Sequence, residues 1–260
     1  MLAAIILLGI AALLPGFADE PQLPKDANEP AATASSDDAA AETQTQPADA
    51  GRVPAPEFKR LNSVIGEWRG VGQPKRGSRQ GAWTEKLINE WSITPQASSV
   101  VLRSDRGQLF SEIQLRWLAD CEQLEATLID GEDRTVFRGT IPDEWPGRIE
   151  LFSGSDESET AERLTLQQLS EIRFVVLLER RTSPTGRFRR VAGVGYTRSG
   201  ERLAAGATNQ RTCIVTGGLG TMTVTHKGQT YYVCCSGCRR AFEADPDYYI
   251  AQSKSGDKSE

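Results

Sequence analysis

Histidine is nearly missing from this chain of 260 residues, which contains only His226. No histidine precedes the last fifty residues, so a Ser-His-Asp triad cannot be built in that part of the chain. A haem held there by a histidine ligand is excluded for the same reason. We assign no catalytic residue and expect a binding protein and not an enzyme.

Long apolar runs are also missing, apart from the thirteen residues Leu2–Leu14. This run is too short to span a bilayer comfortably. The residues that follow, Pro15-Gly16-Phe17-Ala18, are typical of a secretory signal peptide cleaved after Ala18, which assigns residues 1–18. An uncleaved anchor is the alternative, and the short run disfavours it. We expect an exported protein of a bacterial envelope, periplasmic or extracellular, with no stable membrane insertion after cleavage.

Positive charge is scarce between Asp19 and Ala50, where Ala, Pro, Ser, Thr, Gln and acids predominate. The eight acids and one lysine of this stretch carry −7 and the whole chain carries −5, so the residues from Gly51 onward carry about +2. A segment with so little to bury should be disordered, and we assign residues 19–54 to an acidic linker. The nearly neutral remainder gives no reason to expect nucleic-acid binding.

Helical periodicity is absent from most of residues 55–208, which consist of short β-rich runs separated by turn signals such as Asp130-Gly131. About nine strands at regular spacing favour an antiparallel barrel or sandwich, and a helix is expected only at Pro56–Ile65. The clearest runs are Gly81–Trp91, Leu109–Leu118, Gln123–Ile129, Thr135–Thr140, Arg148–Phe152, Glu171–Glu179 and Arg190–Thr197.

The two ends of this region carry short motifs. Gly66-Glu67-Trp68 follows the expected helix, and Arg190–Arg198 closes the region. These motifs resemble the first and last strands of lipocalin-like (calycin) β-barrels. The resemblance implies an antiparallel barrel, and such barrels often hold a small apolar ligand. Two interpretations stay open for the five tryptophans: core and rim packing, which we favour, or the lining of a ligand cavity.

Cysteine is concentrated near the C-terminus, where four of the five fall within twenty-six residues. Cys213, Cys234 and Cys238 have the spacing Cys-x20-Cys-x3-Cys, and Cys235 lies beside the second. Thiolates grouped in this way suit a soft or borderline metal ion. The fifth, Cys121, is expected to be a single buried or idle thiol.

The residues between these cysteines favour their convergence. The glycine-rich residues 217–220 permit a tight turn after Cys213. Lys227-Gly228 predicts a hairpin turn that places Met222 and Val224 opposite Val233 and Tyr231. A helix should begin at Ser236 and end at Pro246, which places two cysteines at its start, where the helix dipole favours the thiolate.

The fourth ligand is left open by the sequence. His226 lies at the hairpin turn, about five residues from the level of Cys234, and at ~3.3 Å per residue this is on the order of 16 Å, beyond the reach of one metal ion. Cys235 is nearer, but it must point away from its neighbour, so it either fills a core position or ligates in an altered geometry. Water or a partner's thiol could also complete the site.

The C-terminal motifs run Cys213-Ile214-Val215-Thr216-Gly217-Gly218-Leu219-Gly220, then Tyr231-Tyr232-Val233-Cys234-Cys235-Ser236-Gly237-Cys238, then Phe242-x-x-x-Pro246-x-x-Tyr249. Their cysteine spacing, their aromatic strand and their helix ending near a proline resemble the YHS/TRASH group of small cysteine modules. Ile214 departs from the proline that is frequent there, and the doubled cysteine occurs in some members. The resemblance implies metal binding, and many members are linked to copper or other heavy-metal handling.

We therefore expect residues 209–252 to be a metal-binding module, followed by a disordered tail at 253–260. One zinc or Cu(I) ion per chain would be bound by Cys213, Cys234 and Cys238, with Cys235 as the best fourth candidate, in metal sensing, sequestration or transfer. Two alternatives remain. The module could form disulfides and bind no metal, since the compartment is oxidising. The barrel could instead carry a small apolar molecule, with the module as its cap.

Overall fold

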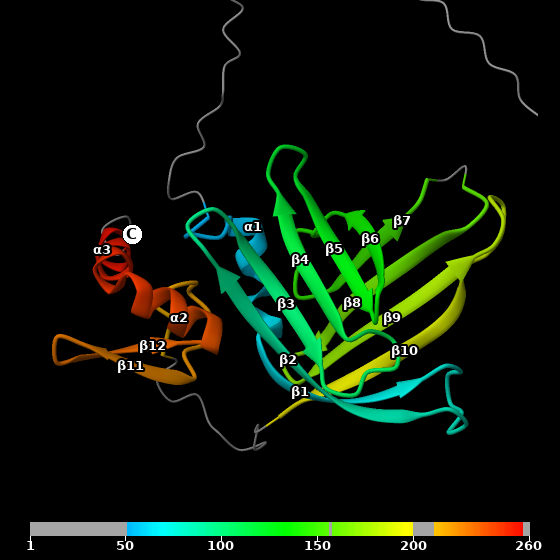
Figure 1. Ribbon diagram of the computed structural model, residues 1–260, viewed down its shortest axis with the longest axis horizontal. Coiled ribbons are helices and arrows are strands. Elements are labelled where there is room, and N and C mark those ends of the chain that lie inside the picture. The colour runs from blue at the N-terminus through cyan, green and yellow to red at the C-terminus, as the bar shows by residue number, and fades with distance from the viewer. Residues whose placement is uncertain (1–50, 156–157, 200–210, 257–260) are drawn as a thin grey trace, which may run out of the picture. The chain divides into compact units, whose positions relative to one another are not determined.

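The computed structural model describes residues 51–155, 158–199 and 211–256. Most of these residues form a closed antiparallel barrel, in which β1 pairs with both β2 and β10 (Figure 1). The predicted mainly β fold class is confirmed, with ten barrel strands where about nine were expected. The strands are β1 (Gly66–Gln73), β2 (Trp83–Ile93), β3 (Ser98–Ser104), β4 (Glu112–Leu118), β5 (Gln123–Asp130), β6 (Asp133–Gly139), β7 (Arg148–Ser153), β8 (Ala161–Ser170), β9 (Arg173–Arg181) and β10 (Arg189–Arg198).

The start of the folded part differs from the predicted boundary. The signal peptide and the linker up to residue 50 lie outside the described residues. Residues 51–54, predicted as the end of the linker, are held in the fold: the Gly51 N–H donates to the Pro95 carbonyl at 3.1 Å, and Arg52 pairs with Asp245 at 2.5 Å. The folded part therefore begins no later than Gly51.

The helical lead-in before the barrel occurs where the sequence predicts it, as two short elements. These are α1 (Pro56–Lys59), which begins with a proline in its first turn, and the 3-10 helix η1 (Arg60–Val64). Phe58 and Leu61 are buried, and the Phe58 ring meets Trp91 of β2 edge to face at 5.0 Å between centroids. The lead-in is thereby packed against the barrel.

Aromatic side chains fill much of the barrel interior. The ring of Phe174 lies 5.8 Å from Trp68 and 5.9 Å from Tyr196, in tilted and stacked arrangements. All three residues are buried, and Trp83 and Trp91 are buried as well. These positions agree with the interpretation of the tryptophans as packing residues.

The interior also holds a buried carboxylate, Glu85 of β2. It accepts hydrogen bonds from the Tyr196 hydroxyl and from the Trp83 indole N–H, each at 2.5 Å. Burial raises the pKa of Tyr196 well above its ordinary value, so this phenol remains a donor. Two glycines of β1 make room for the rings, since a Cβ at Gly70 or Gly72 would lie within 2.5 Å of Tyr196 or Trp83 respectively. The Glu85 carboxylate and its two aromatic donors are thus packed together inside the barrel.

The C-terminal module is a β-hairpin followed by two helices. Strands β11 (Met222–His226) and β12 (Gln229–Val233) have the predicted register, with Met222 opposite Val233. The hairpin turn uses positive φ angles at Lys227 (48°) and Gly228 (76°).

The two helices of the module differ in part from the prediction. Helix α2 (Ser236–Ala244) begins and ends where expected. However, Pro246 also begins a further helix, α3 (Pro246–Gly256), so residues 253–256 of the predicted disordered tail are helical. Among the described residues, no helix is long and apolar enough to cross a membrane.

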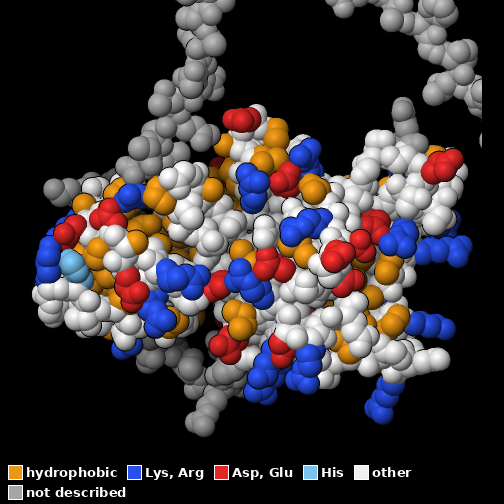
Figure 2. Space-filling view, in the orientation of Figure 1, with side chains coloured by type: hydrophobic (Ala, Val, Ile, Leu, Met, Phe, Trp, Pro, Cys, Tyr) orange, Lys and Arg blue, Asp and Glu red, His pale blue; other side chains and the backbone are white. Residues whose placement is uncertain are grey.

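On the face shown in Figure 2, charged side chains of both signs are interspersed among other side chains. Many pair across neighbouring strands, as Arg163 does with Glu179 at 2.6 Å and Arg138 with Glu125 at 2.8 Å. Such pairs at the surface contribute little stability and mainly keep this face hydrated.

Candidate metal centre

Three cysteines of the module converge on one point. The sulfurs of Cys213, Cys234 and Cys238 all lie within 4.8 Å of one another, and those of Cys234 and Cys238 are 3.5 Å apart. All three residues are buried, with at most 7% of their surface exposed. The structure therefore brings together the three cysteines that the sequence spacing singled out.

The first cysteine is held by a compact loop. The Cys213 N–H donates to the Gly218 carbonyl at 2.7 Å, and its carbonyl accepts from the Gly217 N–H at 2.9 Å. Gly217 has a φ of 78°, a left-handed conformation that glycine adopts readily. A β-bridge between Thr212 and Leu219 closes the loop. This loop turns Cys213 toward the cysteines that follow β12.

Cys235 has a different environment from the other three cysteines of the module. Its sulfur lies 3.9 Å from that of Cys234, but it is not part of the three-sulfur group. It accepts hydrogen bonds from the backbone N–H groups of Cys238 at 3.5 Å and Trp91 at 3.4 Å. The first contact makes Cys235 the N-cap of α2, and the second joins it to the barrel.

Thr216 is a residue of the site that sequence reasoning missed, since its place between Cys213 and the glycines was the only sign of it. It is 1% exposed, and its hydroxyl oxygen lies 3.6 Å from the Cys234 sulfur and 3.9 Å from the Cys238 sulfur. The Cys238 thiol donates to this hydroxyl, and between Thr216 and Cys234 either group can be the donor. Thr216 therefore belongs to the immediate surroundings of the three sulfurs.

The thiols shift one another's pKa values in opposite directions. Hydrogen bonds with Cys234 and Cys238 lower the pKa of Cys213 to about 2. The same contacts with Cys213 raise the pKa of Cys234 and of Cys238 well above the ordinary thiol value. Hydrogen bonds with Cys234, and next with Cys238, lower the pKa of Cys235 to about 3. Thiolate character is thus favoured at Cys213 within the three-sulfur group and at Cys235 beside it, with the thiols of Cys234 and Cys238 as donors.

The other two residues that the sequence analysis considered, His226 and Cys121, lie outside the three-sulfur group. His226 is at the far end of the hairpin from Cys234, opposite Gln229, and its Nε2 is 3.3 Å from a carboxylate oxygen of Asp247. Cys121 was expected to be a buried or idle thiol. It is exposed, because it falls in the turn between β4 and β5 and not within a strand.

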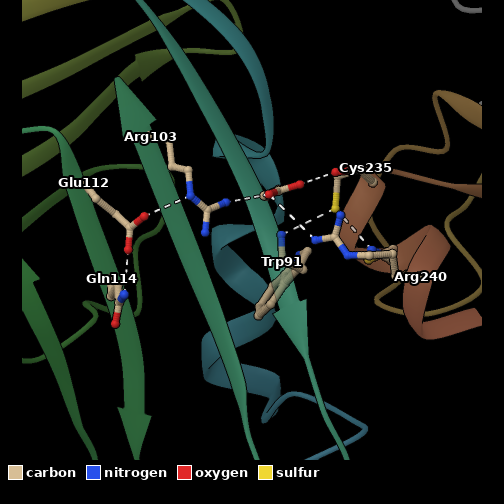
Figure 3. A network of polar contacts seen from close by, with 9 residues as sticks. Trp91, Arg103, Glu112, Gln114, Cys235 and Arg240 are labelled. Atoms are coloured by element: carbon tan, nitrogen blue, oxygen red, sulfur yellow. Dashed lines mark hydrogen bonds and ion pairs between the residues drawn. The ribbon is translucent and has the colours of Figure 1, made fainter. Parts of the chain in front are cut away.

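A polar network fastens the start of α2 to the barrel (Figure 3). Arg103 from β3 and Arg240 from α2 both extend toward the carboxylate of Glu90, at 2.6 Å and 3.8 Å. The Ser236 hydroxyl donates to the same carboxylate. Glu90 is only 9% exposed, and its negative charge lies beside the N-terminus of α2, where the helix dipole favours it.

The backbone of α2 also approaches β2 very closely. A Cβ built on Gly237 would lie 1.5 Å from the Trp91 carbonyl oxygen. Only glycine fits at this position without a shift of the backbone. The helix that carries Cys238 is therefore seated directly on the barrel strand.

Two cavities lie beside the three sulfurs. One of about 630 Å³ is lined by Cys213 and Thr216 together with Lys59, Tyr232 and other residues. The other, of about 290 Å³, is lined by Cys234 among others.

The fold and the site together define a class: a closed antiparallel β-barrel that carries a hairpin-and-helix module with three clustered cysteines. No family model matches the chain, and no curated protein matches it. The two family resemblances seen in the sequence therefore remain predictions.

Among solved structures, the chain is similar to one described as "Crystal Structure of Rv2717c from M. tuberculosis". The match covers 57% of this chain and 99% of that chain, with 15% identity and a TM-score of 0.38. A likeness of this size carries no argument about function.

Proposed function

We propose that the protein binds one zinc or Cu(I) ion per chain through Cys213, Cys234 and Cys238. The observation that supports this most strongly is the convergence of three buried sulfurs within 4.8 Å. Metal–sulfur bonds of ~2.3 Å imply sulfur–sulfur distances of about 4 Å around one ion. The separation of 3.5 Å between Cys234 and Cys238 is close to that value, so a small movement would accommodate an ion.

The chemistry of the donors also fits a metal. A metal ion needs deprotonated thiols, and the pKa of Cys213 is already lowered by its neighbours. Thiolate sulfur is a soft donor that suits Cu(I) and zinc. Cys235 is the nearest additional sulfur, but its two backbone hydrogen bonds favour a structural role over that of fourth ligand.

The biological role that we propose is metal sensing, sequestration or transfer in a bacterial envelope. The apolar run at Leu2–Leu14 and the small residues after it support export. We propose a binding protein and not an enzyme, since the single histidine is engaged with Asp247 at the hairpin tip. The carrier alternative has less support, because large aromatic side chains occupy the barrel interior.

The proposal is tested by elemental analysis of the full-length protein, purified without a histidine tag. We expect about one zinc or copper ion per chain, and loss of that metal in the Cys213→Ser variant. Cys121→Ser is the matched control, because it removes an exposed thiol outside the cluster. Metal-free wild-type protein whose thiols react only after reduction would contradict the proposal and favour the disulfide alternative.

A further inference from the structure

Two residues outside the module, Asn62 and Trp91, together contact both segments that carry the clustered cysteines. Asn62 contacts the first segment, and Trp91 contacts the second. Asn62 of η1 donates from Nδ2 to the Thr216 carbonyl at 2.9 Å, within the loop that begins at Cys213. The same side chain accepts from the Trp91 indole N–H at 2.9 Å through Oδ1. The Trp91 backbone N–H in turn donates to Cys235, which caps the helix of Cys238. The two residues thus connect one cysteine-bearing segment with the other through the barrel.

The contact of Asn62 with Thr216 reaches the sulfurs through this one residue. Asn62 holds the carbonyl of the residue whose hydroxyl lies 3.6 Å from Cys234 and 3.9 Å from Cys238. The loop is also packed on Asn62, since a Cβ at Gly218 would lie 3.0 Å from its amide group. A change at Asn62 would therefore remove one support of the loop and of the hydroxyl.

Trp91 is positioned to act as a rigid element between these groups. It is fully buried, and its ring is held against Phe58 at 5.0 Å. A side chain whose packing and hydrogen bond are both fixed cannot reorient without disturbing its partners. The position of the Asn62 amide is therefore determined by the core of the barrel.

We propose that Asn62 and Trp91 are positioning residues of the cysteine site, which hold its two halves in binding geometry before an ion arrives. This inference rests on the proposed metal-binding function. On this proposal, barrel residues contribute to the metal affinity of the site, in addition to supporting the module. Partners in the outer sphere of a metal site commonly change its affinity, because they orient the ligands.

The test uses the full chain and Co²⁺ as a spectroscopic probe, since thiolate–Co²⁺ charge-transfer absorption reports on sulfur ligation. Asn62→Ala should weaken Co²⁺ binding about 10- to 100-fold and alter this absorption. Trp91→Phe retains an aromatic ring and the backbone N–H, but it removes the indole donor and leaves a small gap in the packing. Because the Asn62 contact with Thr216 stays in place, we expect a smaller loss of Co²⁺ affinity than in Asn62→Ala.

Asn89→Ala is the matched control. Asn89 of β2 is also buried and donates to a backbone carbonyl, that of Val64 at the end of η1, but this hydrogen bond does not reach the cysteine loop. This variant should lower the unfolding midpoint and leave Co²⁺ affinity at the wild-type value. An equal loss of affinity in Asn62→Ala and Asn89→Ala would overturn the inference, and so would wild-type affinity and absorption in Asn62→Ala.

A second readout separates this inference from the proposed function. Wild-type protein without thiolate–Co²⁺ absorption would refute metal binding by the site. The rate of alkylation by iodoacetamide at Cys213 and Cys234 in the metal-free protein still tests the positioning role. Faster alkylation in Asn62→Ala than in Asn89→Ala supports it, and equal rates in these two variants overturn it.

Discussion

The sulfur of Cys235 lies 3.4 Å from the backbone nitrogen of Trp91 and accepts its N–H, so a cysteine of the module completes a contact with a barrel strand. The same sulfur caps α2 through the Cys238 N–H. A sulfur with these two bonds would have to give up both in order to turn toward a metal. The two adjacent cysteines thus have different roles. Cys234 belongs to the three-sulfur group, and Cys235 joins the module to the barrel.

This division predicts different outcomes for two Cys→Ser variants. Cys235→Ser should retain about one metal ion per chain, because serine is a good N-cap and can accept the same hydrogen bonds. Cys238→Ser should lose the metal, because it removes one of the three clustered sulfurs. Elemental analysis of the two proteins checks this. Metal loss in Cys235→Ser without loss of folding would identify Cys235 as a ligand.

A second prediction concerns the close approach of α2 to the barrel. Gly237→Ala places a methyl group 1.5 Å from the Trp91 carbonyl oxygen, so α2 must shift. We expect a loss of about 1–3 kcal/mol in the free energy of unfolding, as for other overpacked sites. Urea unfolding measures it.

Gly195→Ala is the control for this substitution. A Cβ at Gly195, on β10, would meet no atom within 4 Å. This variant should unfold with nearly the wild-type midpoint. Equal midpoints for Gly237→Ala and Gly195→Ala would contradict the seating of α2 on β2.

A third prediction follows from the ion pair between Arg52 and Asp245. The hydrogen bond from Arg52 lowers the pKa of Asp245, and the Tyr248 N–H bond adds to this. Because the folded-state pKa lies below the unfolded value, the pair stabilises the fold above the ordinary carboxyl pKa. That stabilisation is lost as the pH falls through the folded-state pKa.

Asp245→Asn should therefore lower the thermal midpoint at pH 7. The gap from wild type should begin to narrow as the pH falls below about 4, the ordinary carboxyl pKa, and should close below the lowered folded-state pKa, where the wild-type carboxyl is also neutral. Thermal unfolding followed by circular dichroism between pH 7 and pH 3 measures the gap. A gap of constant size across this range would show that the charge of Asp245 does not contribute.

A fourth prediction tests the buried carboxylate inside the barrel. Tyr196→Phe removes one of the two donors to Glu85 and should destabilise the fold by about 1–3 kcal/mol in urea unfolding. The loss in free energy of unfolding caused by Tyr196→Phe should be smaller in a Glu85→Gln background. There, the group that loses its hydrogen-bond partner is a neutral amide and not a carboxylate. An equal cost in both backgrounds would mean that the phenol acts by packing alone.

The barrel could be predicted from the sequence wherever its strands alternate. In β5, for example, Leu124, Ala126 and Leu128 are buried between less buried neighbours. Two strands, β3 and β8, were not among the runs that the sequence picked out. In β3, the consecutive apolar residues 100–102 are all buried, so the alternation that marks a strand disappears.

The three-cysteine group could be predicted from spacing, but its attachment to the barrel could not. In the sequence, Glu90 has the pattern of an exposed charged residue on a strand. In the structure, however, α2 covers it. The contacts of Asn62 and Trp91 with the module likewise join residues far apart in the chain. Such contacts leave no local pattern, because they depend on how two separately formed parts meet.

The most direct test of the account is the native mass of the wild-type protein, isolated without added metal or reductant. We expect a mass higher than that of the reduced chain by one zinc or copper ion, less the protons that the ion displaces, with the increment lost on acid denaturation. A metal-free mass lower by about two mass units for each disulfide formed would contradict it.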